Sequence, residues 1–315
     1  MKSYQRLLIF VLLVLALTAL VSPWAATAWN FISGTAASDG VPFPRFFNRF
    51  FMISGIILFF AYRPLLKVES AAQLGLAPRR RAASDLTVGL CIALASTLAL
   101  GIVMSVAKIY EPFFRLSLSE SAAQCAKAIL TGFTVGFLEE IFFRGIIFRG
   151  LLEDLKPLPA FLAANLFYAG LHFVKPGEEY FLSGIDPWAG FRHLLSTFAP
   201  FLEPAEIAPG IIGLLLIGIV LSYAYLRTGT LYLSIGLHAG WVISIKTVRV
   251  FGDYRTENLG WLFGSSDPKF VSGVATWAAI ILVWLAVHWI TQHRSRLSAR
   301  NETEKIPAPR ELAGI

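Results

Sequence analysis

The chain has 315 residues, of which 56% are hydrophobic and 15% charged, and its formal net charge is +7. Soluble domains carry about a quarter charged residues, so this composition, with a mean hydropathy of +0.64, excludes an ordinary soluble globular protein. Lipid is therefore expected as the main solvent, and membrane lipid rather than nucleic acid as the surrounding partner.

Eight apolar stretches follow one another along the chain. A hydrocarbon core about 30 Å thick needs roughly 20 apolar residues per helical span, and several stretches are shorter than that. The first stretch follows Lys2 and Arg6 and resembles a signal peptide, but its length favours a retained anchor. The sequence predicts an all-α, polytopic transmembrane helical bundle of about eight spans, near residues 7–29, 46–62, 86–107, 126–148, 159–174, 210–226, 230–245 and 271–291.

No repeat or separate soluble domain interrupts these stretches. We expect a single membrane domain at residues 1–292 and a disordered cytoplasmic tail at 293–315. The basic cluster at residues 79–81 and the basic residues of the tail predict that both termini face the cytoplasm. The Ala- and Arg-rich composition favours a multi-pass protein of a bacterial plasma membrane, and no feature predicts an oligomeric state.

Two acids and one base lie within the fourth apolar stretch. Charged side chains in a bilayer are costly, so they indicate a functional site. Glu140 and Arg144 are four residues apart and share a helix face, so they are predicted to pair. Glu139 is turned about 100° from Glu140 by the helical period. This geometry predicts two roles, with Glu140 held by a cation and Glu139 available to a substrate or a water.

Two histidines also fall within apolar stretches. His172 shares a face with Tyr168 and Asn165 in the fifth stretch, and His238 lies one turn before Trp241 in the seventh. At about 1.5 Å per residue, both histidines and the acidic pair reach one broad middle zone of the membrane. This convergence of three helices indicates a site. The remaining histidines are expected at the surface or the membrane interface: His193, His288 and His293.

Three other interpretations fit some of these residues. A Glu-Arg pair and buried histidines can join helices without any chemistry. Two histidines on different spans can ligate a haem, although this leaves Glu139 without a role. A proton-coupled carrier also uses intramembrane acids.

Three motifs in order resemble the CAAX protease and bacteriocin-processing family, intramembrane peptidases that include the Ras-converting CAAX endopeptidases. The first is Glu139-Glu140-x-x-x-Arg144, the second an aromatic residue four positions before His172, and the third a Ser-Ile-x-x-His run ending at His238. The resemblance covers about residues 125–245. It implies an endopeptidase, a hydrolase that cuts a peptide bond of a membrane-associated protein or peptide.

The resemblance implies that Glu139, His172 and His238 are catalytic. Glu139 is expected to act as general base, His172 to hold the attacking water and His238 to donate to the oxyanion. The supporting residues are then Glu140, Arg144, Tyr168, Asn165 and Trp241. Both glutamate-dependent and metal-dependent mechanisms stay open, and if zinc is bound then His172 and His238 are the candidate ligands.

Two positions depart from the family's pattern. Tyr168 stands where the family usually has Phe, and Val242 stands four residues after His238, where Asn is frequent. Valine cannot donate a hydrogen bond, and loss of an oxyanion donor costs roughly 10²- to 10³-fold in turnover. Trp241 or Ser244 is a hypothetical substitute donor. The alternative is a weak or inactive membrane scaffold or immunity protein of the same fold.

Overall fold

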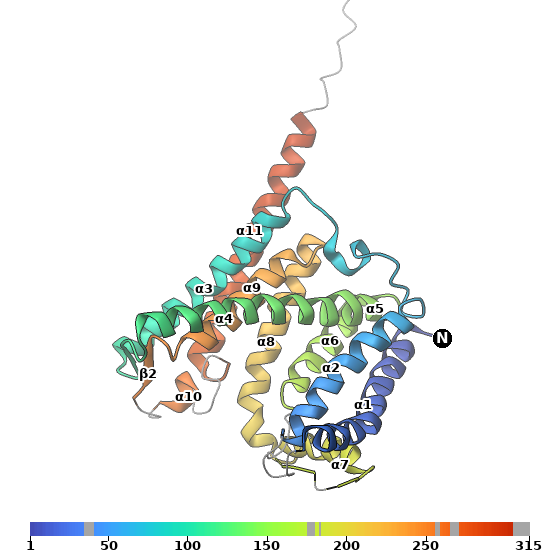
Figure 1. Cartoon of the computed structure of the whole chain (residues 1–315). Helices are drawn as coiled ribbons and strands as arrows, with labels where there is room; N and C mark the ends of the chain where they lie inside the picture. Colours follow the sequence, from blue (N-terminus) through green and yellow to red (C-terminus); the bar gives the residue numbers. More distant parts are fainter. Residues whose placement is uncertain (35–40, 175–179, 183, 256–258, 265–270, 305–315) are drawn as a thin grey trace, which may run out of the picture.

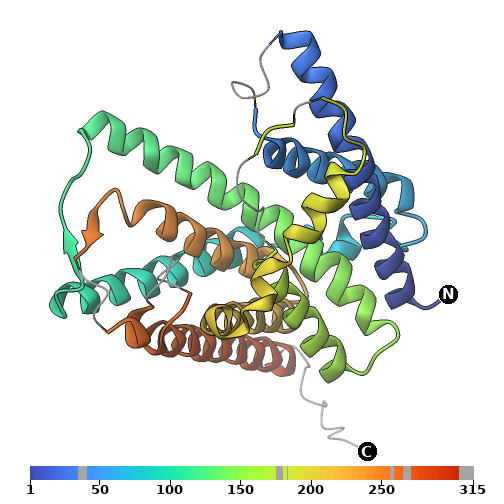
Figure 2. The ribbon, with the colours of Figure 1, turned by 90° about the horizontal axis from the view of Figure 1, so that it is seen from below.

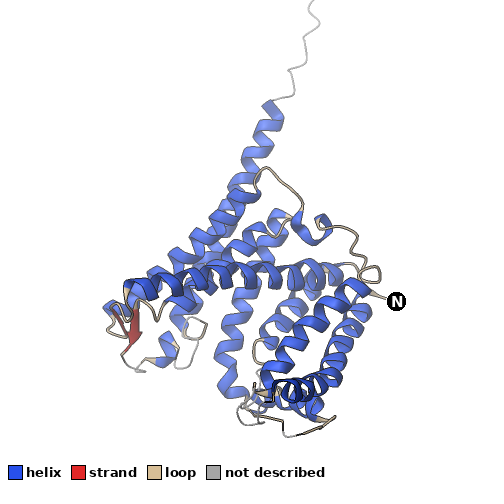
Figure 3. Ribbon diagram, viewed as in Figure 1, coloured by secondary structure: helices blue, strands red, loops and turns tan. Residues whose placement is uncertain are grey.

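The computed structural model describes the chain except residues 35–40, 175–179, 183, 256–258, 265–270 and 305–315. In the described part, helices pack on helices, and a two-stranded antiparallel sheet lies at one end (Figures 1 and 3). The prediction of an all-α, membrane-type fold is therefore confirmed.

The element bounds follow the apolar stretches. The long helices are α1 (Ser3–Ser33), α2 (Phe43–Tyr62), α3 (Ala82–Val106), α4 (Leu118–Glu140), α8 (Pro204–Thr228) and α11 (Val274–Glu304). The shorter ones are α5 (Arg149–Leu152), α6 (Pro157–Leu171), α7 (Ala189–Ser196), α9 (Tyr232–Thr247) and α10 (Gly260–Phe263). Two π-helical segments, η2 (Ala72–Leu76) and η3 (Ile141–Phe148), a 3₁₀ turn η4 (Ala199–Leu202) and the strands β1 (Tyr110–Pro112) and β2 (Gly252–Tyr254) complete the set.

Each predicted stretch falls largely on a helix, but the number of spans is not confirmed as eight. Five helices in the described part are long and apolar enough to cross a membrane, namely α1, α2, α3, α8 and α11. α6 and α9 have 15 and 16 residues, or about 23 Å, which is less than a hydrocarbon core. α11 also continues to Glu304, beyond residue 293, where the tail was predicted to begin.

Close backbone contacts hold α9 between α3 and α4. A Cβ on Gly136 of α4 would lie 3.0 Å from the backbone nitrogen of Ala239, and one on Gly240 would lie 2.6 Å from Ala93 of α3. Membrane helices approach closely where small residues line their interface. The glycines therefore bring His238 of α9 beside the acidic pair at the end of α4.

The acidic pair lies where the winding of a long helix changes. α4, η3 and α5 follow one another without a break, and Figure 1 shows this run (green) passing across α8 and α6. The π-helical segment begins at Ile141, directly after Glu140. Such segments are frequent at functional sites, because the wider turn changes the direction of the side chains that follow.

The N-terminal part packs beside this core. Figures 1 and 2 show α1 and α2 side by side, with α7 crossing near them. Gly190 of α7 lies directly against the Ala19 carbonyl of α1, so a Cβ has no room there. α7 is thus tied to α1, outside the elements that carry the acidic pair and the two intramembrane histidines.

Candidate active site

Glu140 and Arg144 form the predicted ion pair. Arg144 Nη1 lies 2.8 Å from Glu140 Oε1, and the two side chains are 1% and 0% exposed. A buried pair of this kind is stable only when further hydrogen bonds satisfy both ions. Arg144 has such bonds, since Nη2 donates to the Gly218 carbonyl of α8 at 3.1 Å. Glu140 is thereby committed to holding this cation.

His238 contacts the same carboxylate. Its Nδ1 lies 2.8 Å from Glu140 Oε1, and the ring is buried. An ionised carboxylate only accepts hydrogen bonds, so the proton of this bond is on Nδ1. The other nitrogen, Nε2, lies 3.7 Å from Glu139 Oε2. Glu140 therefore orients His238 toward its neighbouring acid.

His172 approaches Glu139 from another helix. It follows the last residue of α6, and its Nδ1 lies 2.8 Å from the Tyr168 carbonyl. A carbonyl also only accepts, so His172 carries its proton on Nδ1. Its Nε2 lies 3.8 Å from Glu139 Oε2. Both imidazoles thus present Nε2 to one carboxylate oxygen.

Glu139 differs from Glu140 as the sequence predicted. Its side chain is 32% exposed, but its Oε2 is buried and makes no hydrogen bond within the described structure. When both histidines are neutral, three acceptor atoms meet here at 3.7 to 3.8 Å. Lone pairs repel one another, so a proton, a water or a metal ion is needed between them. The arrangement is suited to holding and polarising a water.

Tyr168 packs between the catalytic candidates. Its ring lies 4.5 Å from the His172 ring and 6.3 Å from the His238 ring, and Arg144 lies 4.6 Å from its centroid. An arginine over an aromatic face is attracted by the ring quadrupole. Tyr168 therefore supports both the cation and the two imidazoles.

Asn165 reaches the site through a residue that the sequence analysis missed. Ser222 of α8 donates to Asn165 Oδ1 at 2.9 Å, and Arg144 Nε donates to Ser222 Oγ at 3.4 Å. A single serine in a long apolar helix gives no signal of its own, since such residues commonly bond their own backbone. Only the packing of α6 against α8 shows its partners.

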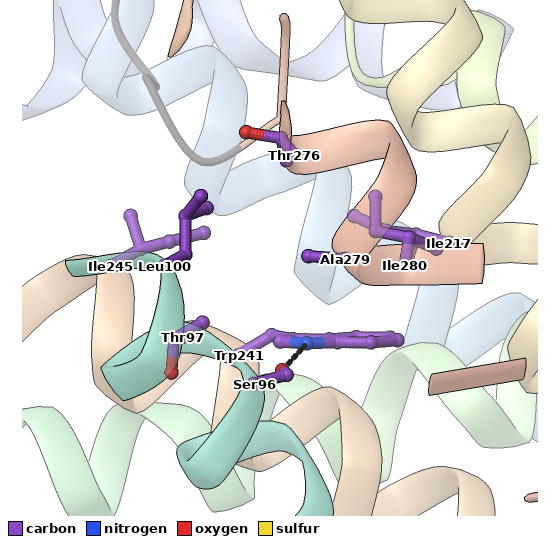
Figure 4. Close-up of a pocket in the computed structure, with 9 residues that line it drawn as sticks. All are labelled: Ser96, Thr97, Leu100, Ile217, Trp241, Ile245, Thr276, Ala279 and Ile280. Atoms are coloured by element: carbon purple, nitrogen blue, oxygen red, sulfur yellow. Dashed lines mark hydrogen bonds between the residues drawn. The ribbon is translucent and has the colours of Figure 1, made fainter. Parts of the chain in front are cut away.

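Trp241 and Ser244 face α3 rather than Glu139. The indole nitrogen of Trp241 donates to Ser96 Oγ at 3.3 Å, as Figure 4 shows, and Ser244 Oγ lies 2.7 Å from Thr97 Oγ1. Ser96, Thr97 and Trp241 also line a cavity between α3, α8, α9 and α11. Both hypothetical substitutes for the missing asparagine therefore already have partners on α3.

Within the part of the chain that the structure describes, no group of three or more His, Cys, Asp or Glu side chains is arranged to hold a metal ion. Zinc on His172 and His238 stays a prediction from the sequence.

Comparison with known proteins agrees with this geometry. Residues 121–244 match the model of a protein family described as Type II CAAX prenyl endopeptidase Rce1-like. No curated protein and no solved structure matches the chain. The matched segment contains Glu139, Glu140, Arg144, His172 and His238. The chain, a multi-pass membrane protein, is thus similar over residues 121–244 to the CAAX protease family, a family of intramembrane proteases.

Proposed function

We propose that this protein is an intramembrane endopeptidase that hydrolyses a peptide bond of a membrane-associated protein or peptide, with Glu139 as its general base. One observation carries the proposal: Glu139 Oε2 faces the Nε2 atoms of His172 and His238 at 3.8 and 3.7 Å, while Glu140 is bound to Arg144. A carboxylate that Arg144 does not hold, beside two oriented imidazoles, is suited to proton transfer.

Charge balance supports one extra proton in this cluster. Glu139 and Glu140 carry two negative charges against the single positive charge of Arg144. A net charge in a low-dielectric site is costly, so the cluster gains by taking up one proton. We place this proton on His238 Nε2, which leaves Glu139 ionised and gives the imidazole a second N–H beside the Nδ1–H bound to Glu140.

The reaction follows from these positions. A water between Glu139 and His172 gives one proton to the Glu139 carboxylate and one hydrogen bond to His172 Nε2, while its oxygen bonds to the substrate carbonyl carbon. The oxyanion that forms accepts the N–H of His238 Nε2. The proton on Glu139 then passes to the amide nitrogen as the C–N bond breaks, which returns Glu139 to its carboxylate form.

The experiment compares the full-length protein with two variants on a diverse peptide library, read by mass spectrometry. We expect cleavage by the parent and a loss of about 10²- to 10⁴-fold in Glu139→Gln, because the amide cannot accept the proton. His238→Ala is also expected to lower the rate, since it removes the oxyanion donor. Parental activity in Glu139→Gln would show that another group is the base.

A matched control distinguishes loss of the base from loss of any acid. Glu111 lies on β1 and pairs with Arg255, outside the catalytic helices, and its side chain is 44% exposed. Glu111→Gln makes the same chemical change and should keep parental activity. Absence of cleavage by the parent would favour the membrane scaffold, and metal analysis of the same samples tests the zinc alternative.

A further inference from the structure

A line of buried hydrogen bonds continues behind Arg144, away from the candidate base. Ser222 on α8 and Asn165 on α6 are each 1% exposed. Arg144 Nε donates to Ser222 Oγ at 3.4 Å, Ser222 Oγ donates to Asn165 Oδ1 at 2.9 Å, and Asn165 Nδ2 donates to the Phe161 carbonyl at 2.8 Å. Three helical segments are joined by this line.

The direction of each bond is determined by chemistry. A guanidinium only donates, so Ser222 Oγ accepts from Arg144 and must direct its own hydrogen elsewhere. The Asn165 carbonyl oxygen receives that hydrogen, because the amide NH₂ is already turned toward the Phe161 carbonyl. Gly218 permits the approach, since a Cβ there would lie 2.8 Å from Asn165 Oδ1. No bond in the line can be reversed without leaving a buried donor unpaired.

The same line reaches the reacting groups through Arg144. Arg144 Nη1 holds Glu140 Oε1 at 2.8 Å, and this oxygen accepts from His238 Nδ1 at 2.8 Å. The opposite ring nitrogen of His238 faces Glu139. A shift of the guanidinium therefore moves the acceptor that holds the Nδ1–H of His238 and orients its ring.

We propose that Asn165 and Ser222 are positioning residues that hold Arg144 against Glu140 and thereby keep His238 protonated on Nδ1 with Nε2 directed at Glu139. The inference rests on the proposed function and adds two residues that touch no reacting atom. If the Asn165–Ser222 bond served only packing, it would join α6 to α8 without affecting His238. The two roles therefore differ in whether loss of this bond changes the protonation of the His238 ring.

The first readout is kinetic and uses the full-length protein. Ser222→Ala should lower kcat about 10-fold with little change in KM, because substrate contacts are intact while the oxyanion donor is displaced. Ser222→Thr keeps the hydroxyl and should restore most of the rate. Because the residues form one line, Ser222→Ala and Asn165→Ala together should cost no more than the larger single effect. Parental kcat in Ser222→Ala, or additive losses, would overturn the proposal.

A matched control removes another interhelical hydroxyl. Thr97 of α3 bonds Ser244 of α9 at 2.7 Å, away from the Arg144 line. If Ser222→Ala lowers the rate through Arg144 and not through a general loosening of helix packing, Thr97→Val should keep the parental kcat. An equal loss of kcat in Thr97→Val would assign Ser222 to packing alone.

The second readout does not need activity. In protein with ¹⁵N-labelled histidine, the His238 signals, identified with His238→Gln, should show protonated Nδ1 and Nε2 in the parent and a partial loss of the Nδ1 proton in Ser222→Ala. Identical spectra would overturn the positioning role. If the parent cleaves no peptide but the His238 signals of Ser222→Ala differ from those of the parent, the proposed function fails while the positioning role of Ser222 is supported.

Discussion

Glu139 and Glu140 are adjacent in sequence and have opposite surroundings. The helical period predicted that Arg144 reaches only Glu140, and the 2.8 Å contact confirms this. The sequence did not predict that His238 would share the same carboxylate oxygen, because that contact depends on how α9 packs against α4. Local pairing was therefore predictable from spacing, while the contact between helices was not.

Val242 is the position where one side chain should change turnover. Trp241 and Ser244 are bonded to α3, which leaves His238 as the proposed oxyanion donor. Val242→Asn adds an amide N–H one turn beyond His238, so we expect kcat to rise roughly 10- to 100-fold. The measurement is cleavage of one identified peptide at saturating concentration. Val242→Leu, which adds volume without a donor, is the control, and an equal rise in both would contradict the prediction.

At the scale of elements, the positions of the helices were predictable and their contacts were not. Apolar runs marked each long helix, but the fourth run was predicted from residue 126, whereas α4 begins at Leu118 after the cap at Ser117, whose Oγ accepts from the Glu120 amide. The polar Ser222 and the enclosed His193 have no such marker. Their partners come from helices far away in the sequence, where a period along one helix carries no information.

The interface between α3 and α9 should be sensitive to one added carbon. A Cβ on Gly236 would meet the Leu86 carbonyl of α3, whereas one on Gly101, in the same helix as Leu86, would meet nothing within 4 Å. Gly236→Ala should lower the free energy of unfolding by about 1–3 kcal/mol. Gly101→Ala should leave it unchanged or raise it by up to about 1 kcal/mol. Thermal unfolding in detergent measures both, and equal effects would contradict this packing.

The stability of the fold should depend on pH through His193 of α7. His193 was expected at a surface, but it is buried against the rings of Phe43, Phe47 and Tyr180, because these aromatic residues enclose α7 on the face toward α2. Burial lowers the pKa of His193 below 6.5, its ordinary value. The unfolded chain therefore takes up a proton at a higher pH than the folded one, and stability is lost as pH falls below about 6.5.

Unfolding at pH 7.5 and 5.5 measures this effect. The parent should lose stability at the lower pH, and His193→Phe should lose less, because its side chain cannot be protonated. An equal loss in the parent and the variant would show that other groups cause the pH dependence.

At the scale of the whole molecule, contacts between distant ends agree with the predicted division of these ends between two sides. Arg6 of α1 bonds Glu153 at 3.1 Å, Arg294 of α11 bonds Asp85, and Arg79 donates to the Thr228 carbonyl at 2.9 Å. Each pair joins two ends that were predicted to be cytoplasmic. β1 and β2 join two segments that were predicted to be outside. The charge pattern thus predicts which ends meet, although it does not determine the number of spans.

The charge pattern of the sequence predicts that the loop between α5 and α6 faces the cytoplasm and that the start of α4 faces outward. In a background with Cys91→Ala and Cys125→Ala, which removes both natural thiols, the exposed positions Lys156 and Ser119 report the two sides. A membrane-impermeant thiol reagent added to intact cells should label Ser119→Cys and spare Lys156→Cys, and lysis should make both reactive. The reverse pattern would show that the chain has the opposite orientation in the membrane. The proposed protease would then have to receive its substrate from the other side.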